Sequence, residues 1–185
     1  MSFDDAFIEQ LGTSRRWRAF SIIVLRLLGL GRPVQIIETG CARKAGNWAG
    51  DGQSTVVWDW VIGKVGGHAM SIDLDAEHCA TARSLAPRVE VICGDSIWNL
   101  RGAHQVEFAD LVYLDAYDVT DDYRSSLHHM GELAAIYEQL PSGCMIAVDD
   151  CISPTRGKHL LVKHFFESIG VKPLVDSYVC VWVKP

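Results

Sequence analysis

Acidic residues stand at or beside the ends of five short apolar runs, and they are the residues whose types and spacing could best do chemistry. Each run has the length and β-branched character of a buried strand. Ligands of parallel sheets bind beyond the carboxyl ends of the strands, so these acids would share one edge of the molecule. A single acid there can also cap the following helix, but five together indicate a ligand site. The acids are Glu38, Asp73, Asp95, Asp115 and the pair Asp149–Asp150.

A long glycine-rich segment, residues 36–55 with the sequence IIETGCARKAGNWAGDGQST, follows the first run. A phosphate-binding P-loop is excluded, because Gln53 replaces its lysine and Asn47 its first glycine. A dinucleotide-binding loop is a weak match. Gly50 and Gly52 lie well past Gly40, where the strand is predicted to end, whereas that loop follows its strand directly.

Glu38, Gly40, Gly52, Ser54 and Thr55 form the series E-x-G…G-x-S-T, and the next predicted strand ends with the residues IDLD. This order resembles class I S-adenosylmethionine-dependent methyltransferases. It is similar in particular to a subgroup of small, metal-dependent O-methyltransferases, with a short insertion in the loop. The resemblance extends from about residue 34 to residue 185.

The resemblance implies a site for S-adenosylmethionine. Gly40 would let the backbone approach the amino acid end of the cofactor, and Glu38 would orient the loop or meet the ammonium group. Asp73 would accept hydrogen bonds from the two ribose hydroxyls, and Asp95 from the exocyclic amine of adenine. The predicted cofactor-binding residues are Glu38, Gly40, Gly52, Ser54, Thr55, Asp73, Gly94, Asp95 and Ser96.

The resemblance also implies a metal site. Asp115, Asp149 and Asp150 fall on the positions of the aspartates that bind a divalent cation in these O-methyltransferases. Three hard oxygen ligands suit Mg²⁺, which would lower the pKa of an acceptor hydroxyl and orient it. The implied reaction is methyl transfer to a hydroxyl of a small molecule such as a sugar, a glycoside or a phenol.

The general base is left open at this point. Catechol-type members of the family carry a lysine a few residues after the strand-four aspartate, where this chain has Asp118. Ionisation by the metal alone is one alternative, and a side-chain base is the other. The predicted catalytic residues are Asp115, His128 and His129, with Lys158 and His159 as further candidates for the base.

The elements that must position these residues alternate along the chain. Two helices are predicted within residues 3–30, and strands alternate with helices from residue 33 onward. Such alternation indicates a mostly parallel sheet that is covered on both faces. The last two strands, residues 172–176 and 178–185, are one turn apart and must pair antiparallel. The prediction is an α/β, Rossmann-like, doubly wound sheet of seven strands. One domain over 1–185 would combine a helical segment, 1–32, with a core, 33–185.

Composition narrows the classes of partner. The chain has 185 residues, 49% of them hydrophobic, and a net charge of −6, which favours a globular domain and argues against nucleic acid. The cluster Arg15, Arg16 and Arg18 is interpreted as a solvated helix face. The apolar run 20–30 contains Arg26 and is too short to span a membrane. We expect this run to pack on the core, where it could also join two subunits into a homodimer.

Six cysteines without CxxC pairs and an acidic N-terminus without a secretory signal predict a reduced, cytoplasmic protein. Two other functions stay open: an NAD-dependent oxidoreductase, and a non-catalytic module that binds S-adenosylmethionine. Trp48 lies in the glycine-rich segment, where it would either cover a ligand or pack on the core.

Overall fold

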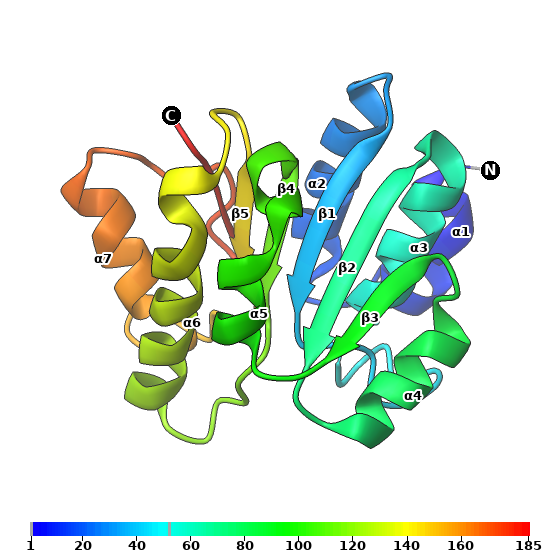
Figure 1. Cartoon of the computed structure of the whole chain (residues 1–185), viewed down its shortest axis with the longest axis horizontal. Helices are drawn as coiled ribbons and strands as arrows, with labels where there is room; N and C mark the ends of the chain where they lie inside the picture. The colour runs from blue at the N-terminus through cyan, green and yellow to red at the C-terminus, as the bar shows by residue number, and fades with distance from the viewer. Residues whose placement is uncertain (1, 52) are drawn as a thin grey trace.

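The computed structural model describes residues 2–51 and 53–185, so the predicted contact of Gly52 lies outside the described residues. Helices flank a central sheet on both sides (Figure 1). The helices are α1 (Phe3–Leu11), α2 (Trp17–Gly29), α3 (Ser54–Val65), α4 (Ala76–Leu85), α5 (Ser96–Gly102), α6 (Asp122–Ile136) and α7 (Leu160–Ser168). The strands are β1 (Val34–Thr39), β2 (Gly67–Asp73), β3 (Val89–Cys93), β4 (Leu111–Leu114), β5 (Met145–Val148) and β6 (Cys180–Val183).

The strand order is β3-β2-β1-β4-β5-β6, and every pair is parallel except β5 with β6. The chain moves outward from β1 to β3 and then returns to β4 on the other side of β1. Strand order therefore reverses between β1 and β4, which is where open α/β sheets bind their ligands.

Two apolar clusters fill the two faces of the sheet. One contains side chains of α1, α2, α3 and α4, and the other contains side chains of α5, α6 and α7. All four residues of β4 and of β5 are buried, as expected for parallel strands covered on both faces. The apolar face of α2 is buried within the chain through Phe20, Ile23 and Leu27. Among the described residues, no helix has the length and apolar character needed to cross a bilayer.

The described residues form a sheet of six strands, so the predicted count of seven is wrong. Residues 172–176 make one isolated antiparallel bridge, Val175 to Val181, instead of a strand. Pro173 has no backbone N–H for a ladder, and Leu174 and Val175 both donate to the same oxygen, that of Val181. The predicted antiparallel closure is correct, because β6 pairs antiparallel with β5.

Helix α5 and the 3-10 helix η1 (His104–Phe108) were not anticipated from the sequence. Both are short and lie between β3 and β4. Helix α5 begins after Asp95, whose carboxylate accepts a hydrogen bond from the Trp98 N–H. The capping alternative for strand-end acids therefore applies to Asp95.

Candidate active site

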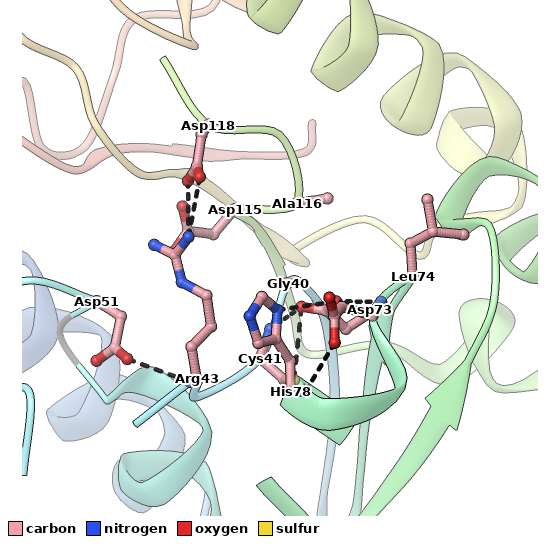
Figure 2. A pocket seen from close by; sticks show the side chains of 11 residues that line it. Gly40, Cys41, Arg43, Asp51, Asp73, Leu74, His78, Asp115, Ala116 and Asp118 are labelled. Atoms are coloured by element: carbon pink, nitrogen blue, oxygen red, sulfur yellow. Dashed lines mark hydrogen bonds and ion pairs between the residues drawn. The ribbon is translucent and has the colours of Figure 1, made fainter. Parts of the chain in front are cut away.

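A cavity of about 250 Å³ lies at the carboxyl ends of β1, β2 and β4, where strand order reverses (Figure 2). Its lining combines a glycine turn, several carboxylates and one arginine. Parallel strands bring these residues together because their carboxyl ends meet at one edge of the sheet. The lining residues that matter below are Gly40, Cys41, Arg43, Asp73, Asp115 and Asp118.

Gly40 allows the ends of β1 and β4 to approach each other closely. Its φ is +78°, and a Cβ at this position would lie 2.5 Å from the carbonyl oxygen of Asp115. Both the backbone conformation and the missing space therefore require glycine. Gly40 also lies among the residues that line the cavity.

Asp73 ends β2 and points into the same cavity (Figure 2). Its Oδ2 accepts from the backbone N–H of Cys41 at 3.1 Å, and its Oδ1 accepts from the backbone N–H of Asp75 at 2.8 Å. Two backbone donors thus hold the carboxylate in one orientation, and the Cys41 thiol and His78 Nδ1 each lie 3.5 Å from one of its oxygens.

A second, smaller cavity of about 100 Å³ adjoins the first and shares Asp73, Leu74 and Ala116 with it. Its other lining residues include Asp95 and Ser96, at the start of α5, and His128 of α6. We call the two cavities together the groove, which lies at the carboxyl ends of β1, β2, β3 and β4.

Glu38, Ser54 and Thr55 lie behind this groove and are buried. Glu38 accepts from the Thr55 hydroxyl at 2.7 Å, the Ser71 hydroxyl at 2.6 Å and the Trp58 ring N–H at 2.8 Å. Burial raises the pKa of Glu38 to about 7, although the hydrogen bonds from these donors act to lower it. These hydrogen bonds join β1 to β2 and to the start of α3 and direct the Glu38 carboxylate into the interior.

The start of α3 corrects one detail of the sequence interpretation. Ser54 is the first residue of the helix, and its N-cap is Gln53, with φ of +52°. Thr55 ties the loop to the helix, because its hydroxyl accepts from the Ala42 N–H at 3.0 Å. Gly94, also predicted to contact the cofactor, directly follows β3 and donates its N–H to the Asp73 carbonyl at 2.9 Å.

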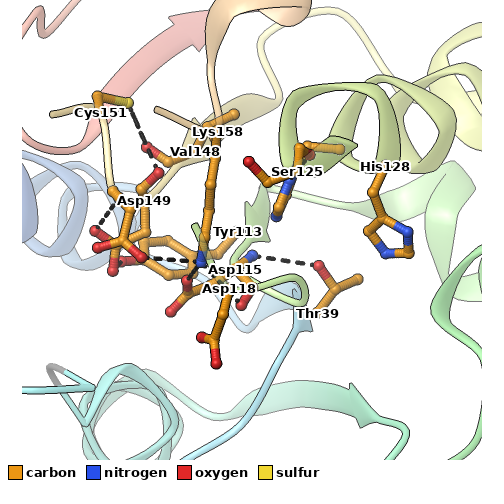
Figure 3. Close-up of polar contacts among 12 residues, drawn as sticks. Thr39, Tyr113, Asp115, Asp118, Ser125, His128, Val148, Asp149, Cys151 and Lys158 are labelled. Atoms are coloured by element: carbon orange, nitrogen blue, oxygen red, sulfur yellow. Dashed lines mark hydrogen bonds and ion pairs between the residues drawn. The ribbon is translucent and has the colours of Figure 1, made fainter. Parts of the chain in front are cut away.

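The three predicted metal ligands converge, but two protein cations lie among them. Figure 3 shows one of these cations, Lys158, beside Asp115. The ammonium of Lys158 pairs with Asp115 and lies 3.0 Å from Asp150 Oδ2. Arg16 donates from Nε to Asp149 Oδ2 at 2.6 Å and from Nη2 to Asp150 Oδ1 at 3.1 Å. We call these five residues the ion-pair cluster.

Charge governs the ion-pair cluster. Burial, with Asp149 and Asp150 as neighbours, raises the pKa of Asp115 well above its usual range, while Lys158 opposes that rise. Burial alone would lower the pKa of Lys158, but the surrounding carboxylates raise it, so this ammonium stays charged. Asp115 is the only carboxylate of the ion-pair cluster among the residues lining the 250 Å³ cavity.

Arg16 was misjudged from the sequence. It was interpreted as part of a solvated helix face, yet it is 5% exposed and bonded to Asp149. Its burial depends on Asp149, which lies far away in the sequence, so no local signal could have identified it. Arg43 was also missed. It spans the cavity to Asp118, with Nη1 2.9 Å from Oδ2 (Figure 2).

The two predicted catalytic histidines occupy different environments. His128 lies in the smaller cavity, with Nε2 3.2 Å from both Ser96 Oγ and Glu132 Oε1. The bond to Glu132 raises the pKa of His128. His129 is fully buried, its Nδ1 lies 2.6 Å from the Ser125 carbonyl, and burial lowers its pKa to about 4. The structure brings His128 to the groove but does not bring His129 there.

Trp48 packs on the core instead of lining the groove. Its ring lies 5.6 Å from that of Phe7, measured between centroids, and Phe7 in turn contacts Trp60 of α3. The glycine-rich loop is therefore attached to α1 through aromatic contacts.

Comparison with solved structures gives several matches along most of the chain. MycE, a methyltransferase of mycinamycin biosynthesis solved in complex with Mg and SAH, is 15% identical, with a TM-score of 0.60 over 86% of this chain. The chain spans about half of MycE, 48% of its length. CalS11, a calicheamicin methyltransferase, is 11% identical, with a TM-score of 0.65 over 96% of this chain and 83% of its own.

A third match is a putative O-methyltransferase from Klebsiella pneumoniae. It is 19% identical, with a TM-score of 0.58 over 91% of this chain and 80% of its own. Neither a protein-family model nor a curated protein matches the sequence. These matches agree with the fold described above. The chain has the fold of class I S-adenosylmethionine-dependent methyltransferases.

Proposed function

We propose that this protein transfers a methyl group from S-adenosylmethionine to a hydroxyl of a small molecule, of the sugar, glycoside or phenol class. The observation that carries the proposal is the pairing of Gly40 with Asp73. Gly40 lets the ends of β1 and β4 approach each other beside the cavity, and Asp73 presents an oriented carboxylate in the same cavity.

The groove fits the parts of S-adenosylmethionine in order. The turn at Gly40 suits the amino acid end, and Asp73 suits the ribose diol. Asp95 and Ser96 would border the adenine, beside the largely exposed side chain of Leu74, which offers an apolar surface to the base. When bound, the cofactor supplies an electrophilic methyl on a sulfonium. The chain contributes binding and orientation.

Asp115 is the residue we propose to hold the acceptor. It lines the cavity, and its carboxylate would accept the hydrogen of an acceptor hydroxyl. Asp115 would accept the hydroxyl proton as the methyl group passes from sulfur to the acceptor oxygen. Lys158 holds Asp115 in place.

The ion-pair cluster also fits a divalent cation in its ligand chemistry, and the ammonium of Lys158 shows that positive charge is favoured there. Asp115, Asp149 and Asp150 are the residues that would hold Mg²⁺, which would lower the pKa of the acceptor hydroxyl. Because like charges repel, Lys158 would first have to leave Asp115 and Asp150. In this proposal, Mg²⁺ and Lys158 compete for the same carboxylates.

The activities named for similar structures support a hydroxyl as the methyl acceptor. CalS11 is described as a TDP-rhamnose 3'-O-methyltransferase and NovP as an O-methyltransferase, whereas NodS is an N-methyltransferase. MycE was solved with Mg, SAH and mycinamycin VI. O-methyltransferases outnumber the N-methyltransferase among these structures, so we propose a hydroxyl acceptor. The carboxylate oxygens of the ion-pair cluster suit such an acceptor.

The deciding experiment is calorimetric titration of the protein with S-adenosylhomocysteine and, separately, with NAD⁺, each in Mg²⁺ and in EDTA. We expect binding of S-adenosylhomocysteine alone. Binding of NAD⁺ alone would favour the oxidoreductase, and binding of neither would contradict the proposal. A panel of hydroxylated acceptors with labelled S-adenosylmethionine then separates the enzyme from a non-catalytic module, which would methylate none of them.

A further inference from the structure

Two cysteines and a histidine form a cluster next to the ion-pair cluster but outside the groove. Cys151 follows the end of β5, His159 precedes α7, and Cys180 begins β6. One ligand atom from each lies within 4.8 Å of the others, and all three residues are buried. Among the residues that the structure describes, no other group of three His, Cys, Asp or Glu residues meets this distance.

His159 is the first sign that the cluster lacks a ligand. Its side chain is 1% exposed, and its Nδ1 has no hydrogen-bond partner among the described residues. A buried polar atom without a partner costs free energy, and native structures rarely leave one. A neutral imidazole can offer the lone pair of such a nitrogen to a metal.

The two thiols make only weak contacts in the absence of a metal. The Sγ of Cys151 lies 3.2 Å from the Val148 carbonyl, and the Sγ of Cys180 lies 3.4 Å from the Ser177 carbonyl. Asp176 stands beside them, with Oδ1 3.6 Å from the Sγ of Cys180. A carboxylate is therefore present at the edge of the cluster, and its other oxygen, Oδ2, lies 3.7 Å from Lys163 Nζ.

The cluster is reachable from solvent. A cavity of about 540 Å³ is lined by Cys151, His159 and Asp176, so three of the four candidate ligands border one opening. In a tetrahedral zinc site, bonds of about 2.3 Å to sulfur and about 2.0 Å to nitrogen place the ligand atoms roughly 3.3–3.8 Å apart. Small side-chain rotations would bring the present atoms to that spacing.

We propose that Cys151, His159 and Cys180, with Asp176 as the fourth ligand, bind a Zn²⁺ ion. Thiolate and imidazole ligands select zinc over Mg²⁺, which prefers oxygen. Binding releases the thiol protons, and the Zn–S and Zn–N bonds replace the weak contacts described above. The four ligands close the site, so the ion is structural.

The position of the ligands in the chain gives this zinc site a consequence for the groove. Cys151 directly follows Asp150, and His159 directly follows Lys158. A bound ion would therefore fix both ends of the segment 151–159. It would also hold Asp150 and Lys158, two members of the ion-pair cluster, in fixed positions relative to each other. The proposal stands independently of the methyltransferase proposal, because zinc binding requires no cofactor.

The test uses the full chain, reduced and stripped with EDTA, and titrated with Zn²⁺ against a chromophoric chelator. Co²⁺ serves as a spectroscopic probe. We expect one ion per chain and the strong visible bands of tetrahedral, thiolate-bound Co²⁺. Cys151→Ser, Cys180→Ser and His159→Gln should each weaken zinc affinity beyond the roughly 10- to 100-fold typical of outer-shell changes.

Two controls keep the result interpretable. Cys144→Ser removes a buried cysteine outside the cluster, and Cys93→Ser removes an exposed one. Both should leave zinc affinity unchanged. Absence of zinc uptake by the reduced wild-type chain would overturn the proposal without any variant. So would equal uptake by the cluster variants and the controls, or a Cys151–Cys180 disulfide in a chain that binds no zinc once reduced.

Discussion

Asp73 is a single side chain on which cofactor binding is proposed to depend. Backbone donors of Cys41 and Asp75 orient it, so its substitution by asparagine keeps the shape but exchanges a carboxylate for an amide. We expect Asp73→Asn to weaken S-adenosylhomocysteine binding by a factor of roughly 10 to 100, as for loss of charge-assisted hydrogen bonds. Calorimetric titration measures it. Glu90→Gln, which changes an exposed strand acid, is the control, and equal affinities would refute the role of Asp73.

Gly40 and Gly46 distinguish two reasons for a glycine in this loop, which are a positive φ angle and the lack of space for a Cβ atom. Their φ angles are similar, +78° and +70°, but a Cβ on Gly46 meets nothing within 4 Å, whereas one on Gly40 meets Asp115. Gly46→Ala should cost about 1–2 kcal/mol of stability through backbone strain alone. Gly40→Ala should cost more, because the ends of β1 and β4 must also separate. Urea unfolding compares them, and equal losses would show that the contact is not tight.

Several elements meet at Lys158, which connects the segment before α7 to the ends of β4 and β5. Lys158→Met leaves Asp115 and Asp150 without their shared cation. Stability at neutral pH should fall by about 3–5 kcal/mol, as when one partner of a buried ion pair is removed. Lys172→Met, at an exposed position, is the control and should change little.

The same variant tests the competition between Lys158 and Mg²⁺. If Mg²⁺ occupies the place of the ammonium, adding it should raise the melting temperature of Lys158→Met more than that of the wild type. Differential scanning calorimetry in Mg²⁺ and in EDTA measures the difference. An equal response of both proteins would exclude Asp115, Asp149 and Asp150 as the ligands of Mg²⁺.

The pH dependence of the whole molecule should carry a contribution from Glu38, which joins β1, β2 and α3. Burial raises its pKa from 4.5 to about 7, so the folded chain binds this proton more tightly than the unfolded chain. The contribution therefore favours folding at low pH and is lost as pH rises from 4.5 to about 7. Its magnitude is on the order of 3 kcal/mol.

Comparison of wild type with Glu38→Gln isolates that contribution. His129 acts in the opposite direction, because its lowered pKa favours folding as pH rises, so only the difference between the two proteins is informative. The stability of the wild type relative to Glu38→Gln should decline between pH 4.5 and pH 7. Parallel unfolding curves across this window would show that Glu38 does not titrate there.

Arg16 attaches the N-terminal helices to the strand ends that form the candidate site. It lies just before α2 and is bonded to Asp149, which follows β5. The N-terminal helices are thus attached both by apolar packing and by a buried ion pair. Phe20, Ile23 and Leu27 of the apolar run that suggested a subunit interface are used in that packing. Leu25 and Leu30 of the same run are exposed, and the homodimer stays a prediction.

The alternation of apolar runs with helical segments was sufficient to predict the α/β sheet. A strand that is buried on both faces consists almost entirely of apolar residues, so it can be recognised from its own sequence. Parallel strands present their carboxyl ends at one edge, so the convergence of Asp73, Asp95, Asp115 and Asp149 also followed from the sequence. Local patterns carry these features, since each depends on residues within one element.

The tertiary structure alone decided which partners those residues meet. Lys158 and Arg16 reach the acids from segments distant in sequence, Glu38 turns toward the interior, and Pro173 limits the expected seventh strand to one bridge. The cluster of Cys151, His159 and Cys180 likewise has no local spacing motif. Contacts between distant segments depend on how whole helices and strands pack together. The sequence periodicity of one element indicates which of its faces is buried, but it does not indicate which residues that face will meet.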